Sequence, residues 1–88
     1  MNAPQQVERI KEIMRGHNRH GVFVTSGSRL RTAAPYHVNV FCDNRDAVSN
    51  LILEYAITKE FPHVCCAITD TTNLFRASML VDNSQQRT

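Results

Sequence analysis

Histidine and cysteine are the residues of this chain with the widest chemical repertoire: His17, His20, His37, Cys42, His63, Cys65 and Cys66. Zinc in proteins takes four nitrogen or sulfur ligands in a tetrahedron, usually from close pairs in turns. The chain has no Cys-x-x-Cys pair, and its closest histidines are His17 and His20. Cys65 and Cys66 are neighbours in an expected strand, so they point to opposite faces of a sheet. We therefore expect no metal site, no cofactor, and cysteines that act as small apolar residues.

A cysteine nucleophile is the second chemistry to consider, because His63 and Cys65 lie two residues apart in an expected strand and share one face. Nucleophilic catalysis needs a thiolate, a nearby base and donors for the developing negative charge. The run from Val64 to Ile68 is apolar, and a thiol in such surroundings stays protonated. We therefore expect a protein that is not an enzyme, and a small Cys/His enzyme is the third reading.

Four arginines are the predicted binding residues: Arg15, Arg19, Arg29 and Arg31. The formal net charge is +2, but residues 1–36 hold six cationic against two acidic side chains, whereas residues 37–88 hold four against six. Arginine forks suit phosphate or carboxylate groups, and Thr25 to Ser28 adds hydroxyls and flexible backbone beside Arg29 and Arg31. No Gly-x-x-x-x-Gly-Lys element is present. We expect the four arginines to form one basic face.

The elements that must position these residues follow from the apolar pattern. The first helix is predicted between Pro4 and Gly16, on a stripe formed by Val7, Ile10, Ile13 and Met14. A β-branched and aromatic run predicts a strand over residues 21–25. Ser26-Gly27-Ser28 is expected to break it and to open a long loop that reaches Pro35. Alternating residues then predict a strand over 36–42, with Val38, Val40 and Cys42 on one face.

A second helix is predicted from a cap at Asp43 or Asn44 to about Lys59 or Glu60, because Pro62 disfavours helical geometry at Phe61. Its predicted apolar face comprises Ala47, Val48, Leu51, Ile52, Tyr55 and Ala56, widened by Leu53 and Ile57. The surplus is expected to pack against the first helix or against a second subunit. Two further strands are predicted over 64–69 and 74–81. The first places Val64, Cys66 and Ile68 on one face. The second is expected to point Arg76 and Ser78 outward and to point inward Phe75, Ala77, Met79 and Val81.

Residues 1–82 are thus predicted to form a single α+β domain, and residues 83–88 a polar, flexible tail. The order α-β-β-α-β-β predicts a two-layer sandwich, in which a four-stranded, mostly antiparallel sheet carries two helices on one face. No apolar run approaches the roughly 20 residues of a membrane span, and no secretory signal opens the chain. The odd number of cysteines argues against a disulfide framework, so we expect a cytoplasmic protein. The initial Met suggests a complete short reading frame.

These observations favour a small non-catalytic binding module that docks on another macromolecule. It would act as a protein inhibitor or adaptor of the kind that phages and mobile elements encode, although no residue pattern specifies this. A protein partner is expected, and a homodimer is an open alternative. The other alternative is a nucleic-acid-binding regulator that uses the basic face, with Phe23, Tyr36 or Phe41 as a stacking surface.

Overall fold

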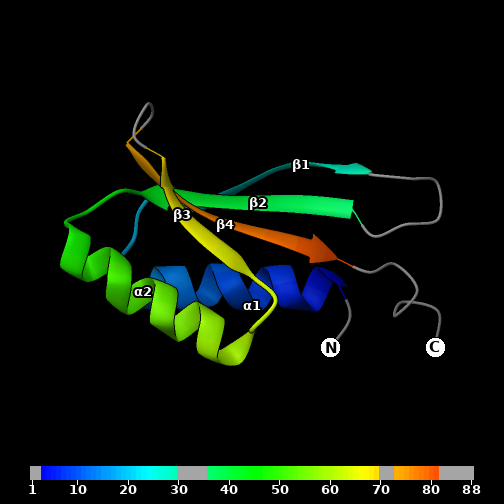
Figure 1. Cartoon of the computed structure of the whole chain (residues 1–88). Helices are drawn as coiled ribbons and strands as arrows, with labels where there is room; N and C mark the ends of the chain where they lie inside the picture. The colour runs from blue at the N-terminus through cyan, green and yellow to red at the C-terminus, as the bar shows by residue number, and fades with distance from the viewer. Residues whose placement is uncertain (1–2, 30–35, 70–72, 82–88) are drawn as a thin grey trace.

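The computed structural model describes residues 3–29, 36–69 and 73–81. Its elements are α1 (Ala3–Gly16), β1 (Phe23–Arg29), β2 (Tyr36–Asp43), α2 (Ala47–Glu60), β3 (Cys65–Thr69) and β4 (Leu74–Val81). The strands form one antiparallel sheet in the order β1-β2-β4-β3. Both helices lie on the same side of this sheet, with α2 and β3 nearest to the viewer (Figure 1). The predicted α+β fold and element order are confirmed.

α1 begins at Ala3, one residue before the predicted start at Pro4, ends at the predicted Gly16, and buries the predicted stripe, with Ile10 and Met14 fully buried. α2 begins later than predicted, because Asp46 is its N-cap: the Asp46 carboxylate accepts the backbone N–H of Ser49 at 2.8 Å. The predicted cap at Asp43 or Asn44 is wrong. The Asp43 carboxylate is already used by the backbone N–H of His20 and by Arg45.

β1 is longer than predicted, because Ser26-Gly27-Ser28 does not end it. The strand runs on to Arg29, with a register shift against β2 between Thr25 and Ser28. A bulge of this kind absorbs residues that fit the ladder poorly and lets pairing resume beyond them. The predicted loop over 26–35 is therefore wrong in its first four residues, and 30–35 lie outside the described residues. The predicted tail over 83–88 also lies outside them.

The core lies between the inner face of the sheet and the two helices. The predicted inward residues of β2 and β4 are confirmed as far as the side chains are described, with Val40, Cys42 and Ala77 fully buried. On β3, Cys66 packs against the core but Ile68 stays 46% exposed, because β3 is an edge strand. The buried apolar set is Ile10, Ile13, Met14, Val38, Val40, Cys42, Leu53, Ile57, Phe61, Val64, Phe75, Ala77 and Met79.

α2 turns a different face to the core from the one predicted. Asn50, Leu53 and Ile57 are its buried residues. Four residues of the predicted inner face are instead exposed: Val48, Leu51, Ile52 and Tyr55. α2 is apolar on nearly all sides, so its periodicity does not select a face. We attribute the orientation to the cap at Asp46 and to Asn50, whose amide donates to the side chain of Asn44.

Candidate functional site

The four predicted arginines do not form one described basic face. Arg15 is exposed at the end of α1, whereas Arg19 is only 4% exposed. Arg29 is the last residue of β1, and its side chain is not among those that the structure describes. Arg31 lies outside the described residues. Of the two predicted arginines whose side chains are described, the structure therefore exposes Arg15 and buries Arg19.

Arg19 holds the connector between α1 and β1 against the end of β2. Its Nη1 donates to the backbone carbonyl of Asp43 at 2.7 Å, and its Cζ lies 5.9 Å from the centroid of the Phe75 ring. The Nε and Nη2 atoms of Arg19 are buried and have no partner among the described residues. Arg19 thus points into the protein and does not present its guanidinium to a partner.

The Asp43 carboxylate, at the end of β2, also holds the connector between α1 and β1 in place. Its carboxylate accepts the backbone N–H of His20 at 2.9 Å and Nε of Arg45 at 3.0 Å. Burial opposes ionisation of Asp43, but the His20 N–H and the Arg45 guanidinium together hold its pKa below the ordinary value. Arg45 also donates to the carbonyl of Asn18. The cations of this region therefore stabilise the fold, a role that sequence spacing could not reveal because Arg19 lies 24 residues from Asp43 and Arg45 lies 27 residues from Asn18.

Polar side chains form a row across the open face of the sheet, where register places Thr25, Asn39, Ser78 and Cys65 side by side. The Ser78 hydroxyl donates to Oδ1 of Asn39 at 2.7 Å, and Nε2 of His37 contacts the same hydroxyl oxygen. Ser78 thus joins the side chains of Asn39 and His37 into one row of polar contacts.

His37, His63, Cys65 and Ser78 line one hollow of about 370 Å³. Nε2 of His63 also lies 3.1 Å from Oε1 of Gln6 on α1. Cys65 is exposed. No hydrogen bond joins it to a histidine within the described part of the chain. The side-chain pairing that nucleophilic catalysis would need is therefore not formed here.

The other two thiols are buried to different degrees. Burial raises the pKa of Cys42 to about 11. Burial, followed by the charges of Glu54 and Cys65, raises the pKa of Cys66 to about 12. Both thiols stay protonated at neutral pH. Over residues 3–29, 36–69 and 73–81, no three His, Cys, Asp or Glu side chains are grouped so as to hold a metal ion.

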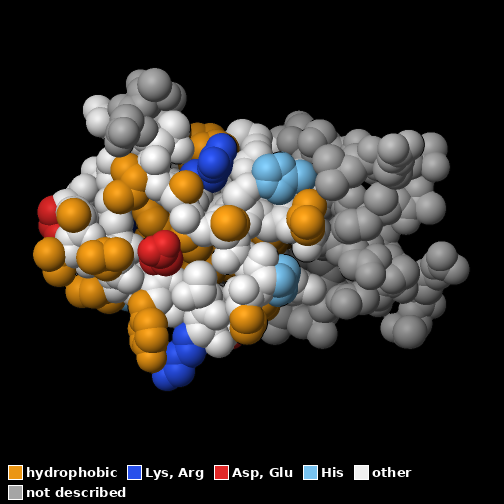
Figure 2. Space-filling model, viewed as in Figure 1, with side chains coloured by type: hydrophobic (Ala, Val, Ile, Leu, Met, Phe, Trp, Pro, Cys, Tyr) orange, Lys and Arg blue, Asp and Glu red, His pale blue; other side chains and the backbone are white. Residues whose placement is uncertain are grey.

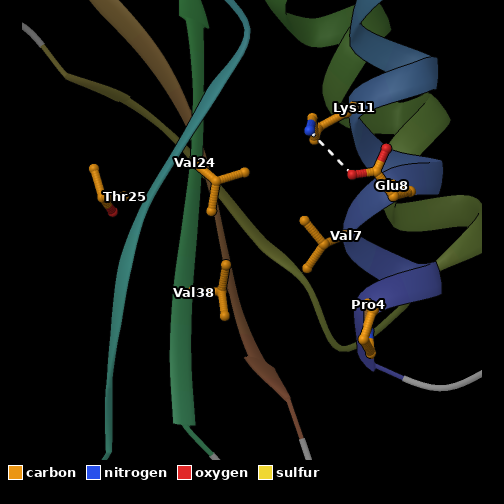
Figure 3. A pocket seen from close by; sticks show the side chains of 7 residues that line it. All are labelled: Pro4, Val7, Glu8, Lys11, Val24, Thr25 and Val38. Atoms are coloured by element: carbon orange, nitrogen blue, oxygen red, sulfur yellow. Dashed lines mark hydrogen bonds and ion pairs between the residues drawn. The ribbon is translucent and has the colours of Figure 1, made fainter.

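A groove of about 410 Å³ separates α1 from β1 and β2 (Figure 3). Val7, Val24 and Val38 point into it from the helix and from the two strands (Figure 3). Lys11 lies at its rim, but its Nζ is 3.1 Å from the carboxylate of Glu8. That ion pair neutralises Lys11 and Glu8, so the described lining of the groove offers no free charge to orient a ligand.

An apolar surface that the sequence did not predict lies on α2. We call Val48, Leu51, Ile52 and Tyr55 the α2 outer face; they are 66%, 64%, 54% and 66% exposed. Their spacing of three and four residues places them on one side of the helix. Figure 2 shows hydrophobic side chains gathered over α2. Sequence reasoning recognised that α2 is too apolar for one sheet face, but it assigned these residues to the core.

Charged side chains lie at the margins of the α2 outer face. Glu54 is the only charged residue of α2 before Lys59. Lys59 places its Nζ 5.8 Å from the ring centroid of Tyr55, at the C-terminal end of the face. Glu60 is turned toward α1, where it pairs with Nε of Arg9 at 2.7 Å. The middle of the α2 outer face is therefore free of charge.

No protein-family model, curated protein or solved structure matches this chain. Neither α1 nor α2 is long and apolar enough to cross a membrane. The candidate function therefore rests on the surfaces described above.

Proposed function

We propose that this chain is a non-catalytic protein-binding module whose contact surface is the α2 outer face. The observation that carries the proposal is the exposure of four large apolar side chains, each at least 54% exposed, on one side of one helix. Single exposed apolar residues are normal, but a contiguous patch marks an interaction surface. An adaptor or inhibitor acts by binding of this kind, without chemistry of its own.

The composition of the α2 outer face supports a protein as the partner. The centres of protein interfaces are poor in charge and rich in aromatic residues, with polar groups at the rim. The α2 outer face has Tyr55, an uncharged middle and Lys59 at one end. We do not place the contact on the basic face predicted from the sequence, because Arg19, one of its four arginines, is buried.

Burial of the α2 outer face would supply part of the free energy that holds a partner. Full burial of one such side chain contributes roughly 1.5–3 kcal/mol, so four that are 54–66% exposed contribute about 4–7 kcal/mol. A partner with a matching surface doubles this figure. Association itself costs roughly 4–15 kcal/mol, and a micromolar complex needs about 8 kcal/mol net. The face therefore fits a partner that offers its own apolar surface.

A photo-crosslinking experiment tests the proposal. A photoreactive phenylalanine is placed at Ile52, in the α2 outer face, and in a second variant at Leu80, which is 51% exposed on the open face of the sheet. After irradiation in native cells, we expect Ile52 to be crosslinked to a protein and Leu80 not to be. Crosslinks to nucleic acid, equal crosslinks from both positions, or none from Ile52 would overturn the proposal.

A second candidate function is binding of single-stranded nucleic acid on the open face of the sheet. Phe23 and Phe41 stack there with ring centroids 5.4 Å apart, and Arg76 lies opposite Phe41 in the register. Stacking of a base on an aromatic ring is worth about 1–3 kcal/mol, so Phe23→Ala is expected to weaken oligonucleotide binding about 5- to 150-fold. No oligonucleotide binding at about 50 mM salt, where phosphate contacts are strongest, would reject this candidate.

A further inference from the structure

We propose that the occupant of the α2 outer face is a second copy of this chain, with the β3 strands of the two copies paired edge to edge. The inference rests on the proposed function and names its partner. It adds a second element, β3, to the contact surface.

β3 offers a regular sheet edge beside the α2 outer face. All five of its residues pair in register with β4. No other strand of the described chain pairs with its far side. Leu51 and Ile68 line the same hollow of about 180 Å³ between α2 and β3, so the helix face and the strand edge are continuous. Figure 2 looks onto both, and its hydrophobic side chains extend from α2 toward β3.

A symmetric dimer requires one axis that serves both elements. The α2 outer face is centred between Leu51 and Ile52, and β3 is centred on Ala67. Leu51 and Ala67 line the same hollow, so the helix and the strand adjoin near both centres. A twofold axis perpendicular to the sheet near these centres pairs β3 antiparallel with its copy and packs α2 antiparallel with its copy. One axis thus satisfies both elements.

The side chains that this axis brings together are compatible. Leu51 meets the partner's Ile52, and Val48 meets the partner's Tyr55. Glu54 lies opposite the partner's Ser49, so the single charge in the middle of α2 does not face its own copy. On the inner face of the sheet, Ile68 is placed opposite the partner's Cys66. Every residue of the α2 outer face therefore gains an apolar neighbour.

The buried area also fits a dimer. The exposed parts of Val48, Leu51, Ile52, Tyr55 and Ile68 amount to about 250–450 Å². A standard interface buries about 800 Å² per partner, of which a little over half is apolar. The five residues supply most of that apolar share, and the β3 backbone with its polar neighbours supplies the remainder. A foreign helix would cover α2 alone and leave the β3 edge unpaired.

The oligomeric state of the purified chain is the first test. Size-exclusion chromatography with light scattering is expected to give a dimer at about 100 µM, well above the Kd of a micromolar complex. Leu51→Lys is expected to weaken the dimer about 30-fold or more, as removal of an interface hot spot does. Leu80→Lys is the matched control, because Leu80 is 51% exposed but outside the proposed contact, and it should remain dimeric. Val48→Lys provides a second disruption should Leu51→Lys fold poorly.

A disulfide trap tests the position of the axis. Leu51→Cys lies beside the axis and should form a disulfide with its own copy under mild oxidation, in a Cys65→Ser background that removes the exposed native thiol. Tyr55→Cys should not, because antiparallel helices place the two copies of residue 55 about 10 Å apart along the helix. Disulfide formation by both variants or by neither would contradict the antiparallel packing.

The outcomes separate the two proposals. A wild-type chain that stays monomeric at about 100 µM, or a dimer that Leu51→Lys and Val48→Lys leave intact, overturns the second-copy inference. If the crosslink from Ile52 then leads to a different protein, the protein-binding function stands with another partner. If it leads to no protein, both proposals fail. A crosslink between two copies of the chain supports both.

Discussion

Leu51 and Leu53 are two residues apart on α2, yet the structure assigns them opposite roles. Leu53 is fully buried, whereas Leu51 is 64% exposed. Leu53→Ala removes buried methyl groups and leaves a cavity, at a cost of about 2–5 kcal/mol. Leu51→Ala leaves no cavity and is expected to change the free energy of unfolding by about 0.5 kcal/mol or less. A chain of this length is stabilised by roughly 4–13 kcal/mol, so the Leu53 change removes a large share.

The pair is measured by urea denaturation followed by circular dichroism, at about 1 µM so that self-association contributes little. The milder Ile57→Val, also fully buried, is expected to cost about 0.5–1.5 kcal/mol and covers the case in which Leu53→Ala does not fold. Equal losses for Leu51→Ala and Leu53→Ala would mean that α2 is oriented differently. The α2 outer face would then not exist as described, and both proposals would lose their basis.

Three further predictions concern single side chains. Arg19→Ala is expected to destabilise the chain by about 1.5–3 kcal/mol in urea denaturation, because Arg19 is 4% exposed and donates to Asp43. The exposed Arg15→Ala is its control, and a neutral Arg19→Ala would contradict the structural role. Ser49 holds the pKa of Asp46 below its ordinary 3.8 through hydrogen bonds from its backbone N–H and hydroxyl, so Asp46 stabilises the fold above that pH and loses this contribution as the pH falls through the lowered pKa. Asp46→Asn should therefore lose less stability than the wild type between about pH 5 and pH 2, and parallel pH profiles would refute the cap. In native alkylation followed by mass spectrometry, the exposed Cys65 should react first. Raised pKa values of about 11 for Cys42 and about 12 for Cys66 should slow these thiols by about 100-fold or more, and equal rates at all three would contradict their burial.

The sequence predicted those elements whose apolar residues fall on one side. α1 has a single apolar stripe, and β2 alternates cleanly, so each has one way to face the core. α2 has apolar residues on nearly all sides, and periodicity cannot choose between the face of Leu51 and that of Leu53. The polar contacts of Asp46 with Ser49 and of Asn50 with Asn44 accompany the face that is buried, and the apolar periodicity does not contain them.

The candidate site was the less predictable part for a related reason. Arg19 resembles an exposed cation in the sequence, and only its contact with Asp43, 24 residues further on, shows that it is buried. The break expected at Ser26-Gly27-Ser28 failed similarly, because the neighbouring β2 supports β1 across a register shift. Local residue preferences describe segments in isolation, and here the partner segment decided the outcome.

The two border strands of the sheet, β1 and β3, differ in regularity, and this difference limits the size of any assembly that pairs by these borders. The regular ladder of β3 can accept a neighbour, but β1 is interrupted by the register shift between Thr25 and Ser28. Irregular edge strands resist edge-to-edge pairing with another sheet. Once the β3 borders of two molecules are joined, only β1 borders remain outside. The dimer proposed above would therefore offer no second regular border, and its growth would stop at a pair instead of continuing into a fibre.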